Sequence, residues 1–185
     1  MFKFLSWRKS IILNKGAMMI EAAMIMPFLL VIVVGGVETA RYVTINQKME
    51  RASVTLSDLV SRATAISTSE LNDIFFATTT IMSPYPMGSN GIVYISSVTK
   101  PVGAVARVTW QRSGSGGFGG ASRIGVQGGN ATLPSGFTLA DNESVIVAEI
   151  LYRYHPMFVD SSFTEDTLYQ RALFRPRLST GVTLN

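Results

Sequence analysis

The chain has 185 residues, no cysteine and a formal net charge of +4. The absence of cysteine excludes disulfides, thiolate metal sites and cysteine nucleophiles. The first 16 residues contain no acid, and their four basic residues account for the whole charge excess: Lys3, Arg8, Lys9 and Lys15. The remainder of the chain is therefore neutral, so its high pI indicates membrane orientation and does not imply a nucleic-acid surface.

An apolar stretch follows this basic segment, and Glu21 is the only ionisable residue between Lys15 and Glu38. As a helix rising about 1.5 Å per residue, the stretch is long enough to cross a hydrocarbon core of about 30 Å. We expect a transmembrane helix over residues 17–40, with the basic N-terminus in the cytoplasm and residues 41–185 across the membrane. In a bacterium, that side is the periplasm. A carboxylate inside such a segment costs about 2.5–3.5 kcal/mol, which makes Glu21 a candidate functional residue.

The order of residue types around this stretch forms a recognisable block. A basic residue and a glycine precede apolar residues and a glutamate, a proline interrupts the apolar run, and a second glutamate and an arginine follow it. These are Lys15, Gly16, Ala17 to Ile20, Glu21, Pro27, Glu38 and Arg41. The block resembles that of the TadE/TadG-like family, which are pseudopilins or minor pilins of the tight-adherence (Tad) type IV pilus system.

The resemblance implies processing and assembly roles for named residues. Residues 1–16 would be a cytoplasmic leader that prepilin peptidase removes by cutting between Gly16 and Ala17. Glu21 would pair with the new N-terminal amine of a neighbouring subunit, relieving the burial cost of both charges. Pro27 would kink the membrane helix. The partners implied are prepilin peptidase, other pilin or pseudopilin subunits, the pilus assembly platform and the inner membrane, with no cofactor and no nucleic acid.

The match is specific over about the first quarter of the chain. Two later segments, residues 145–158 and 168–178, loosely resemble the family's two closing strands. The major pilins of this system usually carry an aromatic residue directly after the glutamate and are far shorter, whereas Ala22 follows Glu21 here. This difference favours an accessory pilin over the bulk filament subunit.

Two other interpretations of the N-terminus stay open. Glu21 could lie near the cytoplasmic interface and extend into the headgroups without a partner. Alternatively, the segment could be a secretory signal peptide with an apolar region from Ala22 to Val34, which would release a soluble product. Against the signal peptide, a cut after Ala40 would leave Glu38 three positions before the cleavage site.

Beyond the membrane run, apolar or small residues recur at spacings of four and three: Ile45, Met49, Ala52, Leu56, Leu59, Ala63 and Ile66. This stripe predicts an amphipathic continuation of the membrane helix, so that one helix runs from about Ala17 to Ala65. We expect the stripe to cover the core of the exported part rather than to form a coiled coil, because only three heptads are present.

The next segments predict a second helix and a sheet. Ser67 and Glu70 have the spacing of a capping box, which predicts a helix from there to about Thr80, before Ser83-Pro84. Alternating apolar and polar residues predict strands over residues 92–99 and 102–112, joined by a turn at Pro101 and Gly103, and two longer strands over residues 144–155 and 167–175. An acidic turn between the last two strands contains Asp160, Glu165 and Asp166.

No set of residues with catalytic or ligand-binding spacing stands out. Gly114, Gly116 and Gly119 spell G-x-G-x-x-G, but no helix is predicted after them, so we interpret residues 113–122 as a flexible surface loop. His155 is the only histidine and has no metal-ligand companion. We therefore expect a structural protein and not an enzyme.

The predicted architecture is an α+β, pilin-like fold. It has a long N-terminal helix with a transmembrane half and an amphipathic half, a short second helix, and an antiparallel β-sheet of about four strands. The function that follows is a pseudopilin or minor pilin of a Tad-type pilus. The alternative is a membrane-anchored or secreted periplasmic binding module, adhesin-like, that never enters a filament.

Overall fold

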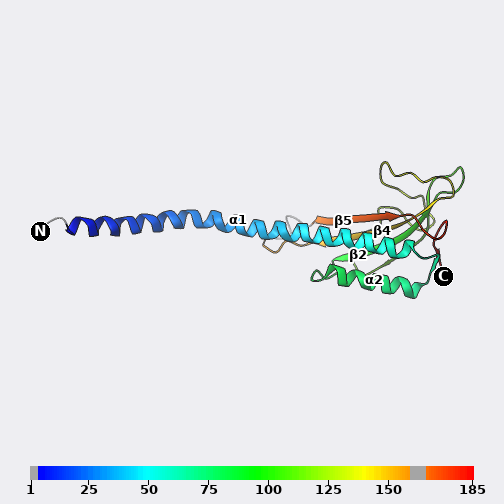
Figure 1. Cartoon of the computed structure of the whole chain (residues 1–185), viewed down its shortest axis with the longest axis horizontal. Coiled ribbons are helices and arrows are strands. Elements are labelled where there is room, and N and C mark those ends of the chain that lie inside the picture. Colours follow the sequence, from blue (N-terminus) through cyan, green and yellow to red (C-terminus); the bar gives the residue numbers. More distant parts are fainter. Residues whose placement is uncertain (1–3, 159–165) are drawn as a thin grey trace. The chain divides into compact units, whose positions relative to one another are not determined.

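The computed structural model describes residues 4–158 and 166–185, with side chains from Gly16 onward. It divides into two compact units, one ending at Arg41 and the other comprising Tyr42–Asn185. The first helix, α1 (Phe4–Ser61), contributes to both units (Figure 1). A second helix and a four-stranded antiparallel sheet complete the fold, which confirms the predicted α+β class.

In the first unit, α1 is already helical at Phe4, well before the expected start at Ala17. Its side chains from Gly16 to Val33 are all exposed. The helix is long and apolar enough, by length and composition, to cross a membrane. One such N-terminal helix fits a single-pass membrane anchor.

In the second unit, α1 turns one face into a core, as the apolar stripe predicts. Ile45, Met49, Ala52 and Leu56 are buried, but the prediction is wrong at Leu59, which is 43% exposed. Val60, four residues after Leu56, is fully buried in its place. The helix also ends earlier than predicted, at Ser61, because the chain there turns to form a strand.

The second helix, α2 (Thr68–Met82), begins as predicted with a capping box. The Ser67 hydroxyl accepts from the Glu70 amide, and the Glu70 carboxylate accepts from the Ser67 amide at 2.7 Å. The Ser67 amide, and then the Ser67 hydroxyl at 2.8 Å, donate to the Glu70 carboxylate and hold the pKa of Glu70 below its ordinary value. The helix ends at Met82, two residues beyond the predicted end and directly before Ser83-Pro84.

The sheet has the order β3-β2-β4-β5, and every neighbouring pair is antiparallel. Its strands are β2 (Gly91–Thr99), β3 (Arg107–Gly114), β4 (Ser144–Tyr154) and β5 (Asp166–Phe174). The turn at Pro101 and Gly103 is present, since the Ala104 amide donates to the Pro101 carbonyl and Gly103 has a φ of 68°.

Several strand boundaries differ from the prediction, and two of these differences change a predicted turn. β3 begins at Arg107 and not at Val102, because the turn takes up the intervening residues. Asp166 is the first residue of β5 and not part of the turn before it. Asp160 and Glu165 lie outside the described residues.

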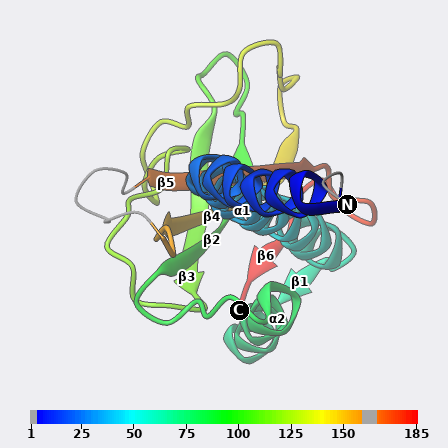
Figure 2. The ribbon, with the colours of Figure 1, turned by 90° about the vertical axis from the view of Figure 1, so that its left-hand side faces the viewer.

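A second, two-stranded parallel sheet was not predicted. It joins β1 (Ala65–Ile66), directly after α1, to β6 (Thr183–Leu184) near the C-terminus (Figure 2). The indole Nε1 of Trp110 donates to the Val182 carbonyl at 2.7 Å and holds the same C-terminal segment against the large sheet. The end of the chain thus closes one side of the core.

The large sheet is covered on both faces. On one face, α1 and α2 pack against Val93, Ile95, Ile146 and Ile150. On the other, the irregular segments between β3 and β4 bury Ile124 and Leu139 against the strands. The sequence predicted cover for only one face.

The glycine-rich segment is held against the protein, which corrects its interpretation as a flexible loop. The amides of Gly117 and Phe118 donate to the carbonyls of Gly88 and Gly91, at 2.7 and 3.2 Å, and the Phe118 side chain is buried. A Cβ on Gly116 would lie 2.1 Å from the Gly91 carbonyl oxygen. Close backbone packing therefore requires a glycine there.

A buried serine fixes α1 on the sheet. The Ser57 hydroxyl donates to the Ala172 carbonyl at 3.0 Å and accepts from the Ala148 amide at 3.2 Å. Ala148 and Ala172 are paired residues of β4 and β5. Their small side chains let the helix approach close enough for its hydroxyl to reach the strand backbones.

Candidate functional site

The predicted processing residues lie in the first unit, on α1. Gly16 is exposed, and a Cβ built on it would meet no atom within 4 Å. Its φ is not in the left-handed region, so neither packing within the chain nor backbone geometry requires a glycine. A requirement for glycine at this position would have to come from a partner that acts on the segment.

Glu21 is exposed and forms no ion pair with any described residue. It lies four residues after Ala17 on a continuous helix, which places the two on the same face, about one turn apart. A free amine at Ala17 would therefore present a positive charge beside the face that carries the Glu21 carboxylate.

The helix continues through Pro27 without a break. Because proline has no amide hydrogen, the Ala23 carbonyl lacks its usual intrahelical donor at that turn. The kink expected at Pro27 stays a prediction.

A polar end to the apolar run lies between Gly35 and Arg41. The Arg41 guanidinium pairs with the Glu38 carboxylate at 3.5 Å, one turn apart on the helix. The Thr39 hydroxyl donates to the Gly35 carbonyl at 2.8 Å. Both interactions satisfy polar groups within the helix itself, as a segment that leaves an apolar medium requires.

The second unit contains a buried carboxylate that sequence reasoning missed. Glu149 of β4 is fully buried and accepts from the Tyr169 hydroxyl at 2.8 Å, from the Arg123 amide at 2.9 Å and from the Ser122 hydroxyl. It connects Ser122 and Arg123, in the segment after the glycine-rich loop, to the face of the sheet opposite α1 and α2. Its signal in the sequence is an acid inside a strand whose neighbours two positions away, Val147 and Leu151, are apolar.

Tyr169 is part of the same cluster. Burial, followed by the charge of Glu149 and the hydrogen bond to it, raises the pKa of the phenol far above its ordinary value of 10.0. The Arg123 guanidinium lies 4.3 Å from the centre of the Tyr169 ring. This arrangement packs a polar cluster under a surface arginine.

The described residues contain no group of three or more histidine, cysteine or acidic residues that could hold a metal ion. His155 directly follows β4 and is partly exposed. In the described chain no helix follows Gly114, Gly116 and Gly119, so the dinucleotide motif lacks the phosphate-binding helix it needs.

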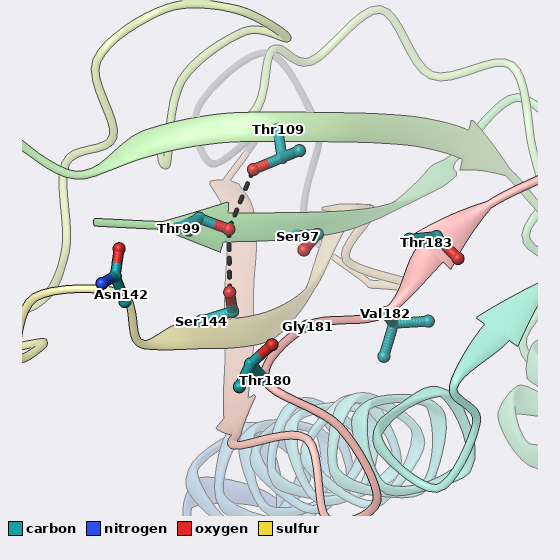
Figure 3. Close-up of a pocket in the computed structure, with 9 residues that line it drawn as sticks. All are labelled: Ser97, Thr99, Thr109, Asn142, Ser144, Thr180, Gly181, Val182 and Thr183. Carbon is teal, nitrogen blue, oxygen red and sulfur yellow. Dashed lines mark hydrogen bonds between the residues drawn. The ribbon is translucent and has the colours of Figure 1, made fainter. Parts of the chain in front are cut away.

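One open cavity in the second unit is lined mainly by serine and threonine residues. It has a volume of about 420 Å³ and lies between the ends of β2, β3 and β4 and the C-terminal segment (Figure 3). Ser97, Thr99, Thr109 and Ser144 come from the strands, and residues 180–183 form the other wall. No pattern in the sequence predicts this cavity, because its hydroxyls come from separate strands.

Residues 16–54 match the family model described as TadE-like protein. The match begins at the predicted cleavage glycine and continues through the apolar run into the buried half of α1. It confirms the resemblance to the TadE/TadG-like family over this segment, and it points to a pilus-associated structural component. No curated protein and no solved structure matches the chain.

Proposed function

We propose that this protein is a pseudopilin or minor pilin of a Tad-type pilus, cleaved by prepilin peptidase after Gly16. The observation that carries the proposal is the TadE-like match over residues 16–54. The exposed and sterically unconstrained Gly16 supports it, because a glycine that the fold does not need is consistent with selection by a peptidase.

In this proposal, Glu21 acts in assembly. The side chain finds no ion-pair partner among the described residues, although it lies within the apolar segment, near its N-terminal end. The Ala17 amine of a neighbouring subunit would supply that partner once cleavage has freed it. Pairing with a second chain relieves two burial costs together, which favours association of processed subunits over unprocessed ones.

The proposal also assigns compartments and partners. Residues 1–16 lie in the cytoplasm, residues 17–40 span the inner membrane, and residues 41–185 form the periplasmic domain, which reaches the cell exterior if the subunit enters the pilus. Prepilin peptidase, other pilin subunits and the assembly platform are the partners. The basic leader before the apolar run supports this orientation.

A second candidate function is a membrane-anchored or secreted binding module that never enters a filament. The observation in its favour is that residues 42–185 form a compact unit with its own core and an open cavity. Such a module would need neither cleavage after Gly16 nor the carboxylate of Glu21.

Mass spectrometry of the mature N-terminus, together with two substitutions, separates these functions. We expect the mature chain to begin at Ala17, and Gly16→Leu to leave an uncut precursor. Glu21→Ala should be cleaved normally but impair pilus assembly, whereas Glu50→Ala, an exposed acid on the same helix, should assemble normally. A mature N-terminus near Gly36 or Arg41 would contradict the proposal, and so would normal piliation by Glu21→Ala at normal protein level.

A further inference from the structure

The face of the sheet that supports α1 changes character along its strands. In β2, Val93 and Ile95 are buried in the core. Ser97 and Thr99 follow on the same face, two and four positions after Ile95. In β4, Ser144 precedes the buried Ile146 by two positions and is the register partner of Thr99. Because alternate residues share a face, the apolar floor continues directly into a hydroxyl floor.

One of these hydroxyls has no hydrogen-bond partner among the described residues, and it is accessible from the cavity. Ser97 is only 2% exposed, lines the cavity and makes no side-chain hydrogen bond to any described residue. In Figure 3, the Ser97 side chain lies among the other residues that line the cavity. Because no described residue bonds this hydroxyl, it is available to a molecule that enters the cavity.

The neighbouring hydroxyls are already ordered. Thr109 donates to Thr99 at 3.0 Å, and the hydroxyls of Thr99 and Ser144 are 2.8 Å apart (Figure 3). Each hydroxyl has one hydrogen and two lone pairs, so these three hydrogen-bonded hydroxyls keep unused acceptor sites along the cavity floor. A ligand that can both donate and accept would find partners without displacing the existing bonds.

The opposite wall is the C-terminal segment. Trp110 holds it through the Val182 carbonyl, and the Ser179 hydroxyl donates to the Gly181 carbonyl at 2.8 Å. A second cavity of about 180 Å³ shares Asn142, Ser144 and Thr180 with the first. The second cavity is also lined by Glu143 and Arg175, whose side chains form an ion pair at 3.3 Å, so the two cavities differ in charge.

We propose that the larger cavity binds a neutral saccharide. The larger cavity is lined by hydroxyls, one amide and the Val182 side chain, with no charged side chain. Hydroxyl and amide groups complement sugar hydroxyls, and a volume of about 420 Å³ lies within the roughly 300–1,000 Å³ typical of small-molecule sites. The proposal goes beyond the role in pilus assembly and does not depend on it.

The test uses the full-length protein in a detergent without a sugar headgroup, because a maltoside detergent would compete for the site. Saturation-transfer NMR measures binding of glucose, galactose, mannose and N-acetylglucosamine, with glucuronic acid as a charged comparison. We expect at least one neutral sugar to bind with millimolar affinity. Ser97→Ala should weaken that binding about five- to tenfold, the loss expected for one hydrogen bond.

Two further variants locate the binding. Thr180→Trp places a large side chain at the exposed mouth of the cavity and should abolish binding without disturbing the core. Ser53→Ala removes an equally buried hydroxyl that bonds only within α1, and should bind like the parent. The proposal is overturned if no neutral sugar binds, if only glucuronic acid binds, or if Ser97→Ala and Thr180→Trp bind as well as the parent.

Discussion

Two methionines on α1 show how differently the two parts of this helix are built. Met19, in the first unit, is 74% exposed, whereas Met49, in the second, is fully buried. Both follow the same helical geometry and have the same side chain. The difference is that residues 42–185 supply their own apolar surroundings, while residues 16–41 depend on an apolar medium or partner outside the chain.

Because of this difference, the two parts of the chain differ in how many positions are constrained. In the first, many apolar residues are interchangeable in character, and the distinctive positions are few: Gly16, Glu21 and Pro27. In the second, close packing constrains many positions at once, so a small change in side-chain volume lowers the stability of the core. Substitutions in the first part should therefore alter processing or assembly, and those in the second should alter folding.

The strongest test of this comparison places a charge first on the buried face and then on the exposed face of α1 in the second unit. A fragment of residues 44–185 should fold in solution without the membrane helix, since its core is complete within the second unit. Leu56→Asp should unfold this fragment, because an unpaired buried charge costs several kcal/mol and a small domain has only about 5–15 kcal/mol in total. Circular dichroism and thermal melting provide the measurement.

Leu59→Asp is the matched control, with the same substitution three residues later on the same helix. Since Leu59 is 43% exposed, the variant should melt close to the parent. If both variants melted like the parent, the face that contains Leu56 would have to meet solvent or another subunit. If both unfolded, Leu59 would be part of the core, as the sequence alone suggested.

A smaller effect is expected at the contact between α1 and the strands. Ser57→Ala removes the hydroxyl that reaches Ala148 and Ala172, and should lower the free energy of unfolding by about 1–2 kcal/mol. Ser53→Ala should lower it by less than about 0.5 kcal/mol, because the Ser53 hydroxyl bonds only to the Glu50 carbonyl of its own helix. Urea denaturation measures the free energy of unfolding of both variants. Equal decreases would show that the hydrogen bonds between α1 and the strands contribute no more than a bond within the helix.

Much of the second unit was predictable because its elements have clear periods. The 3.6-residue period identified Ile45, Met49 and Leu56, and the capping box placed the start of α2 at Ser67. The period failed at Leu59 because the spacing after Leu56 fits both a three-residue and a four-residue step. Both candidates are apolar, and only the packing selects Val60.

The remaining features have no periodic signal. β1 and β6 have two residues each, too few to show alternation, and they are separated by more than 100 residues of chain. The cover on the second face comes from isolated apolar residues such as Phe118 and Ile124 in irregular segments. The cavity around Ser97 arises where separate strands and the C-terminal segment meet, so only tertiary structure reveals it.

The smallest effect concerns Tyr169 and is invisible at neutral pH. Burial beside Glu149 raises the pKa of Tyr169 in the folded state, so the folded protein keeps the phenol proton at a pH where the unfolded chain loses it. The stability from the protonated phenol is therefore fully present below about pH 10 and declines as the pH rises further. In Tyr169→Phe this decline should be shallower, although other groups still titrate in both proteins. Urea denaturation from pH 8 to pH 11, at about half-unit steps, measures the difference. Parallel curves for the two proteins would mean that Tyr169 is free to ionise in the folded state and that the polar cluster around Glu149 is open to water.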